Sequence, residues 1–177
     1  MNDFASEAML RVVRAGLQRQ GLTVDGPPPV RQAHIPLGGK RAWLDRLWNT
    51  HGPDVIVRLG EAVSGMEEEP LSLALSLARD PADLLERWQH LERFVHSRHR
   101  TRVTRPGPGL LLIRHVSLDP LLPPTPAEDL LVFGLLVALC ERVNAPKLQA
   151  RPTGVSGWSR QQRRWHAHPW PADLSTW

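Results

Sequence analysis

The stretch TPAEDLLVFGLLVALCERV, residues 125–143, contains the clearest helix signals in this 177-residue chain. Its first four residues, from Thr125 to Glu128, form a capping box with proline in the first turn, which predicts a helix start. From Leu130 to Val143 the chain is apolar on nearly every side, and Asn144-Ala145-Pro146 then ends the pattern. A helix that is apolar all round must be buried, so we expect Leu130–Val143 to be the central helix of the fold.

Upstream of this helix, the sequence predicts a hairpin and a second long helix. Arg100–Arg105 and Leu110–Val116 flank the sequence PGPG, which indicates two antiparallel strands joined by a tight connection. Asp80-Pro81 is a strong helix start, with a capping residue followed by proline. The buried stripe of that helix is predicted to consist of Leu84, Leu85, Trp88, Leu91 and Val95. Downstream, Lys147–Arg151 and Arg164–His168 are weaker strand candidates.

The N-terminal part of the chain is predicted to be helical. Residues 9–17, 40–50 and 53–63 each carry apolar side chains at helical spacing, whereas LSLALSLA, residues 71–78, fits a strand and a helix equally well. The order of elements predicts an α+β fold in which N-terminal helices precede an antiparallel sheet packed with two longer helices. We expect one domain, residues 1–177, with a helical part of about 1–98 and a sheet part of about 99–177.

Composition limits the classes of protein that the chain can belong to. The single cysteine, Cys140, cannot form an internal disulfide, so a reducing cytoplasm is the expected location. The N-terminus lacks the apolar core of a secretory signal, and the longest apolar run, Leu130–Cys140, is too short to span a bilayer. Residues 144–177 hold five basic residues against one acidic residue and so carry the whole net charge of +4. The high pI is therefore weak evidence for nucleic-acid binding.

Catalytic and metal-binding motifs are missing from the sequence. It contains no G-x-S-x-G, P-loop or G-x-G-x-x-G motif, and we expect neither enzyme activity nor a cofactor. His96, His99 and His115 are residues of a type that binds zinc. The arginines around them would repel a cation, however, and no carboxylate lies nearby in the sequence. We therefore expect no metal site.

The stretch FVHSRHRTRV, residues 94–103, concentrates positive charge and is expected to serve two purposes. His96 and Arg98 are predicted to lie in the last turn of a helix, where a positive charge complements the helix dipole. Arg100 and Arg102 are expected to share one face of the following strand.

That strand face is the candidate ligand site. If the hairpin pairs symmetrically about Gly107 and Pro108, the same face also carries residues of the second strand. The candidate ligand-binding residues are Arg100, Arg102, His115, Leu111 and Ile113. Two arginines and a histidine beside apolar side chains suit an amphipathic anion such as a carboxylate, a phosphate or a nucleotide. An exposed sheet face with ordinary arginines is the alternative.

Several segments together resemble a known family. They are RVVRAGL (11–17), IPLGG (35–39), WNTHGPDVIVRLGEAV (48–63), SLALSLARDPADLLERWQHLERFVHSRHR (72–100) and RRWHAHPWPADLSTW (163–177). Their order and spacing resemble the N-terminal regulatory domain of AraC/XylS-type transcription regulators, in the branch often labelled arabinose-binding-like. The likeness covers roughly residues 9–177 and consists of spacing and apolar positions. One departure is Asp80-Pro81, where the family usually begins a helix with Thr or Ser.

The resemblance implies a function in transcription regulation. It implies that residues 71–78 are helical, that the chain binds a small-molecule effector, and that it forms a homodimer in the cytoplasm without a membrane. It offers no fixed ligand residues to carry over, because effectors vary within the family. Such regulators contact DNA through a C-terminal pair of helix-turn-helix motifs, which nothing in this sequence resembles, so we expect either a truncated piece or a stand-alone domain. Trp43 and Trp48 are candidates for an exposed apolar patch at the dimer interface.

Two other functions remain open at this point. The segment SGWSRQQRRWHAHPWP, residues 156–171, interleaves tryptophan with arginine, a combination that can grip single-stranded nucleic acid. The order of helices and strands also resembles haem-based gas sensors, but a chain without tyrosine lacks their Tyr-x-Ser-x-Arg clamp.

Overall fold

The computed structural model describes residues 4–23, 34–143 and 148–150. In this range the chain forms an α+β fold with six α-helices, one 3-10 turn and two small antiparallel sheets. In chain order the elements are β1 (Phe4–Ser6), α1 (Glu7–Arg19), β2 (His34–Pro36), α2 (Leu37–His51), α3 (Pro53–Glu61), η1 (Ala62–Gly65), α4 (Pro70–Ser76), α5 (Pro81–Val95), β3 (His99–Gly107), β4 (Leu110–Ser117) and α6 (Pro126–Arg142). None of the helices in these ranges has both the length and the apolar character needed to cross a membrane.

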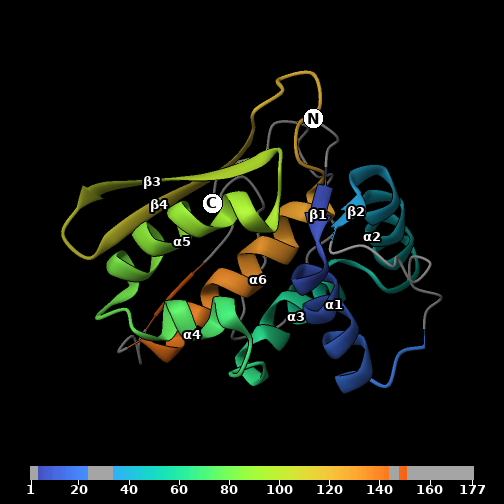
Figure 1. Ribbon diagram of the computed structural model, residues 1–177, viewed down its shortest axis with the longest axis horizontal. Coiled ribbons are helices and arrows are strands. Elements are labelled where there is room, and N and C mark those ends of the chain that lie inside the picture. The colour runs from blue at the N-terminus through green and yellow to red at the C-terminus, as the bar shows by residue number, and fades with distance from the viewer. Residues whose placement is uncertain (1–3, 24–33, 144–147, 151–177) are drawn as a thin grey trace.

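Helix α6 is the centre of the fold, as its sequence predicts. Thr125 caps the helix in a complete capping box with Glu128, and every residue from Ala127 to Cys140 is buried. Figure 1 shows α6 between the β3–β4 hairpin and α5 on one side and α1 and α2 on the other. The β3–β4 sheet packs against helices, but the most extensive partner of α6 is α3 rather than the sheet.

Two glycines allow α3 and α6 to approach this closely. A Cβ atom on Gly134 of α6 would collide with the carbonyl oxygen of Val57 in α3, and a Cβ on Gly60 of α3 would collide with the carbonyl oxygen of Leu131 in α6. The two helix backbones therefore touch directly, and each glycine supplies the space that the other helix occupies.

The β3–β4 hairpin forms where it is predicted, but its register differs from the symmetric pairing. Pro108 and Gly109 make the turn, and Gly109 has a φ of 70°, in the left-handed region that favours glycine. Gly107 pairs with Leu110, and a bulge between Thr104 and Gly107 then adds one residue to β3.

The extra residue reverses which side chains share a face. His115 lies opposite Thr101 rather than Arg100, and Arg102 lies opposite Arg114. The predicted shared face of Arg100, Arg102, Leu111, Ile113 and His115 is therefore wrong.

Helix α5 begins as predicted, with Asp80 accepting a hydrogen bond from the backbone N–H of Asp83. Its end differs from the prediction. The helix stops at Val95, and His96 is already extended, with φ −147° and ψ 128°. His96 and Arg98 therefore lie beyond the last turn, and the prediction that they complement the dipole from within it is wrong.

Other predictions have mixed outcomes. Residues 71–78 are helical over most of their length, since α4 spans Pro70–Ser76. Trp43 is fully buried, so the expectation that it contributes to an exposed dimerisation patch is wrong. Of the strand candidate Lys147–Arg151, the described residues Leu148–Ala150 form no strand, and Arg164–His168 and the Trp–Arg segment 156–171 lie outside the described residues.

Candidate functional site

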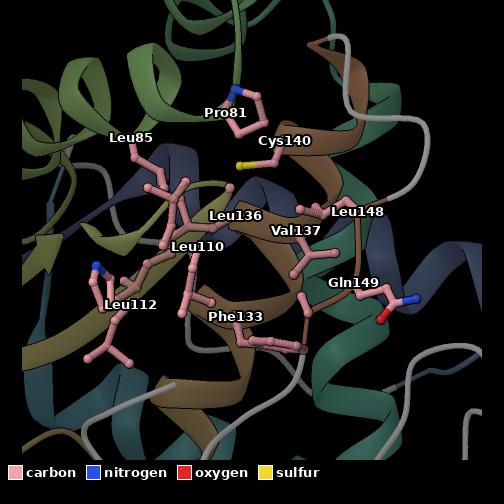
Figure 2. A pocket seen from close by; sticks show the side chains of 15 residues that line it. Pro81, Leu85, Leu110, Leu112, Phe133, Leu136, Val137, Cys140, Leu148 and Gln149 are labelled. Carbon is pink, nitrogen blue, oxygen red and sulfur yellow. The ribbon is translucent and has the colours of Figure 1, made fainter. Parts of the chain in front are cut away.

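An apolar pocket of about 400 Å³ lies between the hairpin, the start of α5 and α6 (Figure 2). Its walls come from four parts of the chain that are distant in sequence. The lining residues are Pro81 and Leu85 of α5, Pro106 and Gly109–Ile113 of the hairpin, Phe133, Leu136, Val137 and Cys140 of α6, and Leu148–Ala150. A volume of this size with an almost entirely apolar lining is typical of small-molecule sites, so the pocket is the first candidate for a functional site.

The pocket is apolar because of how the hairpin and α6 meet. Leu111 and Ile113 are on the hairpin face that packs against the core, and they are half-buried. Phe133, Leu136 and Val137 project from α6, which is apolar all round and so presents an apolar wall in this direction as well. None of the described residues that line the pocket carries a charge.

Cys140 is the lining residue with a potentially reactive group. Its side chain lies on the α6 wall below Pro81 (Figure 2). Burial raises the pKa of the thiol to about 12, so the sulfur is protonated at neutral pH and is a poor nucleophile.

A second feature is a buried polar cluster, formed where α2, α5, the hairpin and the start of α6 meet. Lys40 Nζ lies 2.8 Å from Glu128 Oε1, and Arg41 Nε donates to Glu128 Oε2 over 3.1 Å. Arg41 also lies 3.2 Å from His99 Nε2. Burial by itself would raise the pKa of Glu128. The charge and hydrogen bond of Lys40, the neighbouring His99 and the backbone N–H of Thr125 together outweigh burial and hold that pKa well below its usual range.

Two histidines of this cluster, His96 and His99, are buried and neutral. The rings of His96 and His99 stack at a centroid distance of 4.1 Å. Burial, reinforced for His96 by the charge of Lys40, lowers the pKa of His96 well below its usual range. Burial likewise lowers the pKa of His99 to about 2, against an opposing effect of Glu128. His115, edge-on to His99, lies with its Nδ1 2.7 Å from Asp129 Oδ1.

A buried carboxyl group fixes the hairpin to α5. Glu92 accepts hydrogen bonds from the backbone N–H and the hydroxyl of Thr101, at 2.8–2.9 Å, and Gln89 donates to the Thr101 carbonyl over 2.8 Å. Burial raises the pKa of Glu92 to about 6, even though these hydrogen bonds favour the carboxylate. The outer edge of β3 is therefore held by side chains of α5 at this point.

The cluster resembles a metal site in composition, since His96, His99 and Glu128 each place one ligand atom within 4.8 Å of the others. Two contacts argue against a metal. Lys40 and Arg41 already neutralise both oxygens of Glu128. In addition, His96 Nδ1 accepts hydrogen bonds from two backbone N–H groups, so the neutral ring carries its proton on Nε2, the atom nearest Glu128. To bind a metal here, His96 would have to offer a free lone pair on Nε2, and Glu128 would have to offer a carboxylate that is not already paired with cations.

The predicted ligand residues fall into three places. Leu111 and Ile113 line the apolar pocket. His115 is buried in the polar cluster, 3% exposed. Arg100 and Arg102 lie on the opposite face of the hairpin, where Arg102 is exposed and Arg100 donates to the carbonyl oxygens of His96 and His99.

Several residues of these sites escaped prediction from the sequence. The sequence indicates Glu128 only as part of a capping box and gives no role to Asp129, although both are the acidic partners of the polar cluster. Glu92 had a usable signal, because it follows Trp88 by four residues and so lies on the predicted buried stripe of α5. Lys40 is next to Arg41 in a helix start and gives no such signal.

Comparisons with known proteins do not assign the chain to a family. No protein-family model matches it, and no curated protein matches it.

Proposed function

We propose that the chain is the ligand-sensing regulatory domain of a bacterial-type transcription regulator of the AraC/XylS kind. In this proposal it binds a small effector in the apolar pocket and controls a C-terminal DNA-binding domain. The observation that carries the proposal is the pocket of about 400 Å³. The resemblance of the sequence segments described above supports the same function.

The position of the pocket suits a sensor. A ligand there would contact the hairpin, α5 and α6 at once, and it would also touch Leu148–Ala150. A ligand shifts a conformational equilibrium only when it binds one arrangement better than another. A pocket whose walls belong to separate elements meets this condition, because the ligand contacts depend on how those elements are placed.

The lining of the pocket favours binding rather than catalysis. Among the described lining residues there is no acid or base, and the thiol of Cys140 is held protonated. General acid–base chemistry needs a titratable group near the operating pH, within hydrogen-bond reach of the substrate. We therefore propose a non-enzymatic protein that works in the cytoplasm, without a membrane and as a homodimer, and that contacts DNA through a separate domain.

The experiment that tests this function has two arms. In the first, a chemically diverse small-molecule library is screened against the 1–177 chain by thermal unfolding. Hits are retested on Val137→Trp, which fills the pocket. In the second arm, the chain is fused to a helix-turn-helix DNA-binding domain, and transcription from a reporter is measured with and without each hit.

Ligands that stabilise the chain, lose this effect in Val137→Trp and change reporter output support the proposal. Ligand binding without any change in output would show a binding module with no regulatory function. Salt-dependent binding of the 1–177 chain itself to DNA would instead favour the nucleic-acid-binding alternative.

A further inference from the structure

We infer that the ligand of the apolar pocket is an uncharged, largely hydrocarbon molecule rather than an anion. This inference rests on the proposed function, because it assigns a chemical class to the effector of that same pocket. It reverses the expectation from the sequence, in which arginines and a histidine next to leucines indicated an amphipathic anion.

The wall of the pocket is almost entirely apolar. The described lining is composed of Leu, Ile, Val, Phe, Pro, Ala and Gly side chains and backbone, with Cys140 and Gln149 as the exceptions. Gln149 is exposed, and Figure 2 shows the amide end of its side chain pointing away from the leucines. A ligand in this space therefore finds apolar surface to cover and few groups able to hydrogen-bond to it.

The arginines of the hairpin lie outside the pocket lining. The bulge in β3 places Arg102 and Arg114 opposite each other on the outer face of the hairpin, away from the face that carries Leu111 and Ile113. The guanidinium of Arg100 is bonded to the carbonyl oxygens of His96 and His99.

The two cations of the polar cluster already form ion pairs as well. Lys40 and Arg41 are paired with Glu128 in the polar cluster, and neither lines the apolar pocket. Arg105, next to the lining residue Pro106, is paired with Glu86, and none of the described residues that line the pocket is basic.

A carboxyl group of the protein itself, that of Glu92, shows the effect of burial on such a group. Glu92 is buried and accepts three hydrogen bonds from Thr101, yet its pKa is still raised to about 6. The carboxylate of a ligand would lose its water in the same way, but in the apolar pocket it would gain fewer hydrogen bonds in return. An unpaired buried charge is strongly disfavoured, so the pocket discriminates against an anion of the same shape.

The experiment compares two ligands that share a hydrocarbon chain, 1-decanol and decanoate, on the 1–177 chain. Dissociation constants are measured by calorimetry at about pH 8 for the wild type, Val137→Trp and the double variant Arg102→Ala, Arg114→Ala. We expect the alcohol to bind about tenfold or more tightly than the carboxylate. Val137→Trp should abolish binding of the alcohol, whereas the arginine double variant should bind it as the wild type does.

Three results would overturn the inference. Decanoate binding as tightly as decanol would do so, and so would decanoate binding that the arginine double variant loses. Failure of both ligands to bind would overturn the hydrocarbon assignment. The library screen tests the proposed function separately. Charged hits that stabilise the wild type but not Val137→Trp would support the sensor function and contradict the inferred ligand class. A library without any pocket-dependent hit would contradict both.

Discussion

The close contact of α3 and α6 predicts opposite effects for the same substitution at two helical glycines. Gly134→Ala adds a methyl group that collides with the carbonyl oxygen of Val57. Gly39→Ala adds the same methyl group on α2, where a Cβ atom meets nothing within 4 Å. Both changes raise intrinsic helix propensity, so the difference between them isolates the cost of separating α3 from α6.

The magnitude follows from the two opposing contributions. Alanine is more favourable than glycine in a helix interior by about 1 kcal/mol. Overpacking of a tight core costs about 1–3 kcal/mol, and the upper end applies at Gly134 because a backbone carbonyl cannot rotate away as a side chain does. The expected net effect of Gly134→Ala is a loss of about 2 kcal/mol, or about 4–8 °C in Tm for a chain of this size. Gly39→Ala should gain about 0.5–1 kcal/mol.

The assay is urea unfolding followed by circular dichroism, with thermal melts of the same samples. The midpoint for Gly134→Ala should fall and that for Gly39→Ala should rise, with unchanged slopes. Gly60→Ala, which meets the carbonyl oxygen of Leu131, should behave like Gly134→Ala. If Gly134→Ala proves as stable as Gly39→Ala, the two helices are not in backbone contact, and this account of the core is refuted.

Three further predictions concern the polar cluster and the pocket. Lys40→Met leaves the buried Glu128 with Arg41 alone and should cost about 3 kcal/mol in urea unfolding, because breaking a buried ion pair leaves a charge uncompensated. Glu92 has a folded-state pKa raised from 4.5 to about 6, so its contribution to stability is present below about pH 4.5 and is lost as the pH rises through 6. The Glu92→Gln side chain cannot titrate. Its free energy of unfolding, relative to that of the wild type, should therefore rise by about 2 kcal/mol from pH 4 to pH 8, as measured by urea unfolding at each pH. Cys140, the single cysteine, should react slowly with N-ethylmaleimide, and a pocket ligand should slow the reaction further, as followed by mass spectrometry.

Each of these predictions has a control. Glu86→Gln removes the exposed pair with Arg105 and should cost at most about 1 kcal/mol; an equal cost for Lys40→Met would refute the buried-pair argument. A Glu92→Gln variant with the same pH profile as the wild type would show that Glu92 does not titrate in this range. Labelling of Cys140 that is fast, or that ligands do not affect, would place the thiol outside the pocket.

The sequence by itself determined the elements whose signals are local. The capping box at Thr125, the Asp80-Pro81 start and the Pro108-Gly109 turn each depend on a few neighbouring residues, and the structure has a helix or a turn at each of them. The apolar character of residues 130–140 likewise required α6 to be buried, whatever surrounds it.

Tertiary structure decided the partners of those elements. One extra residue in β3 reversed the faces of the hairpin and separated Arg100 and Arg102 from Leu111 and Ile113, and hairpin length does not reveal such a bulge. The same applies to the pairing of Lys40 with Glu128, which are 88 residues apart, and to the glycine contacts of α3 with α6. These features depend on which backbones meet in space. The sequence pattern of a single helix or strand does not show which other element packs against it.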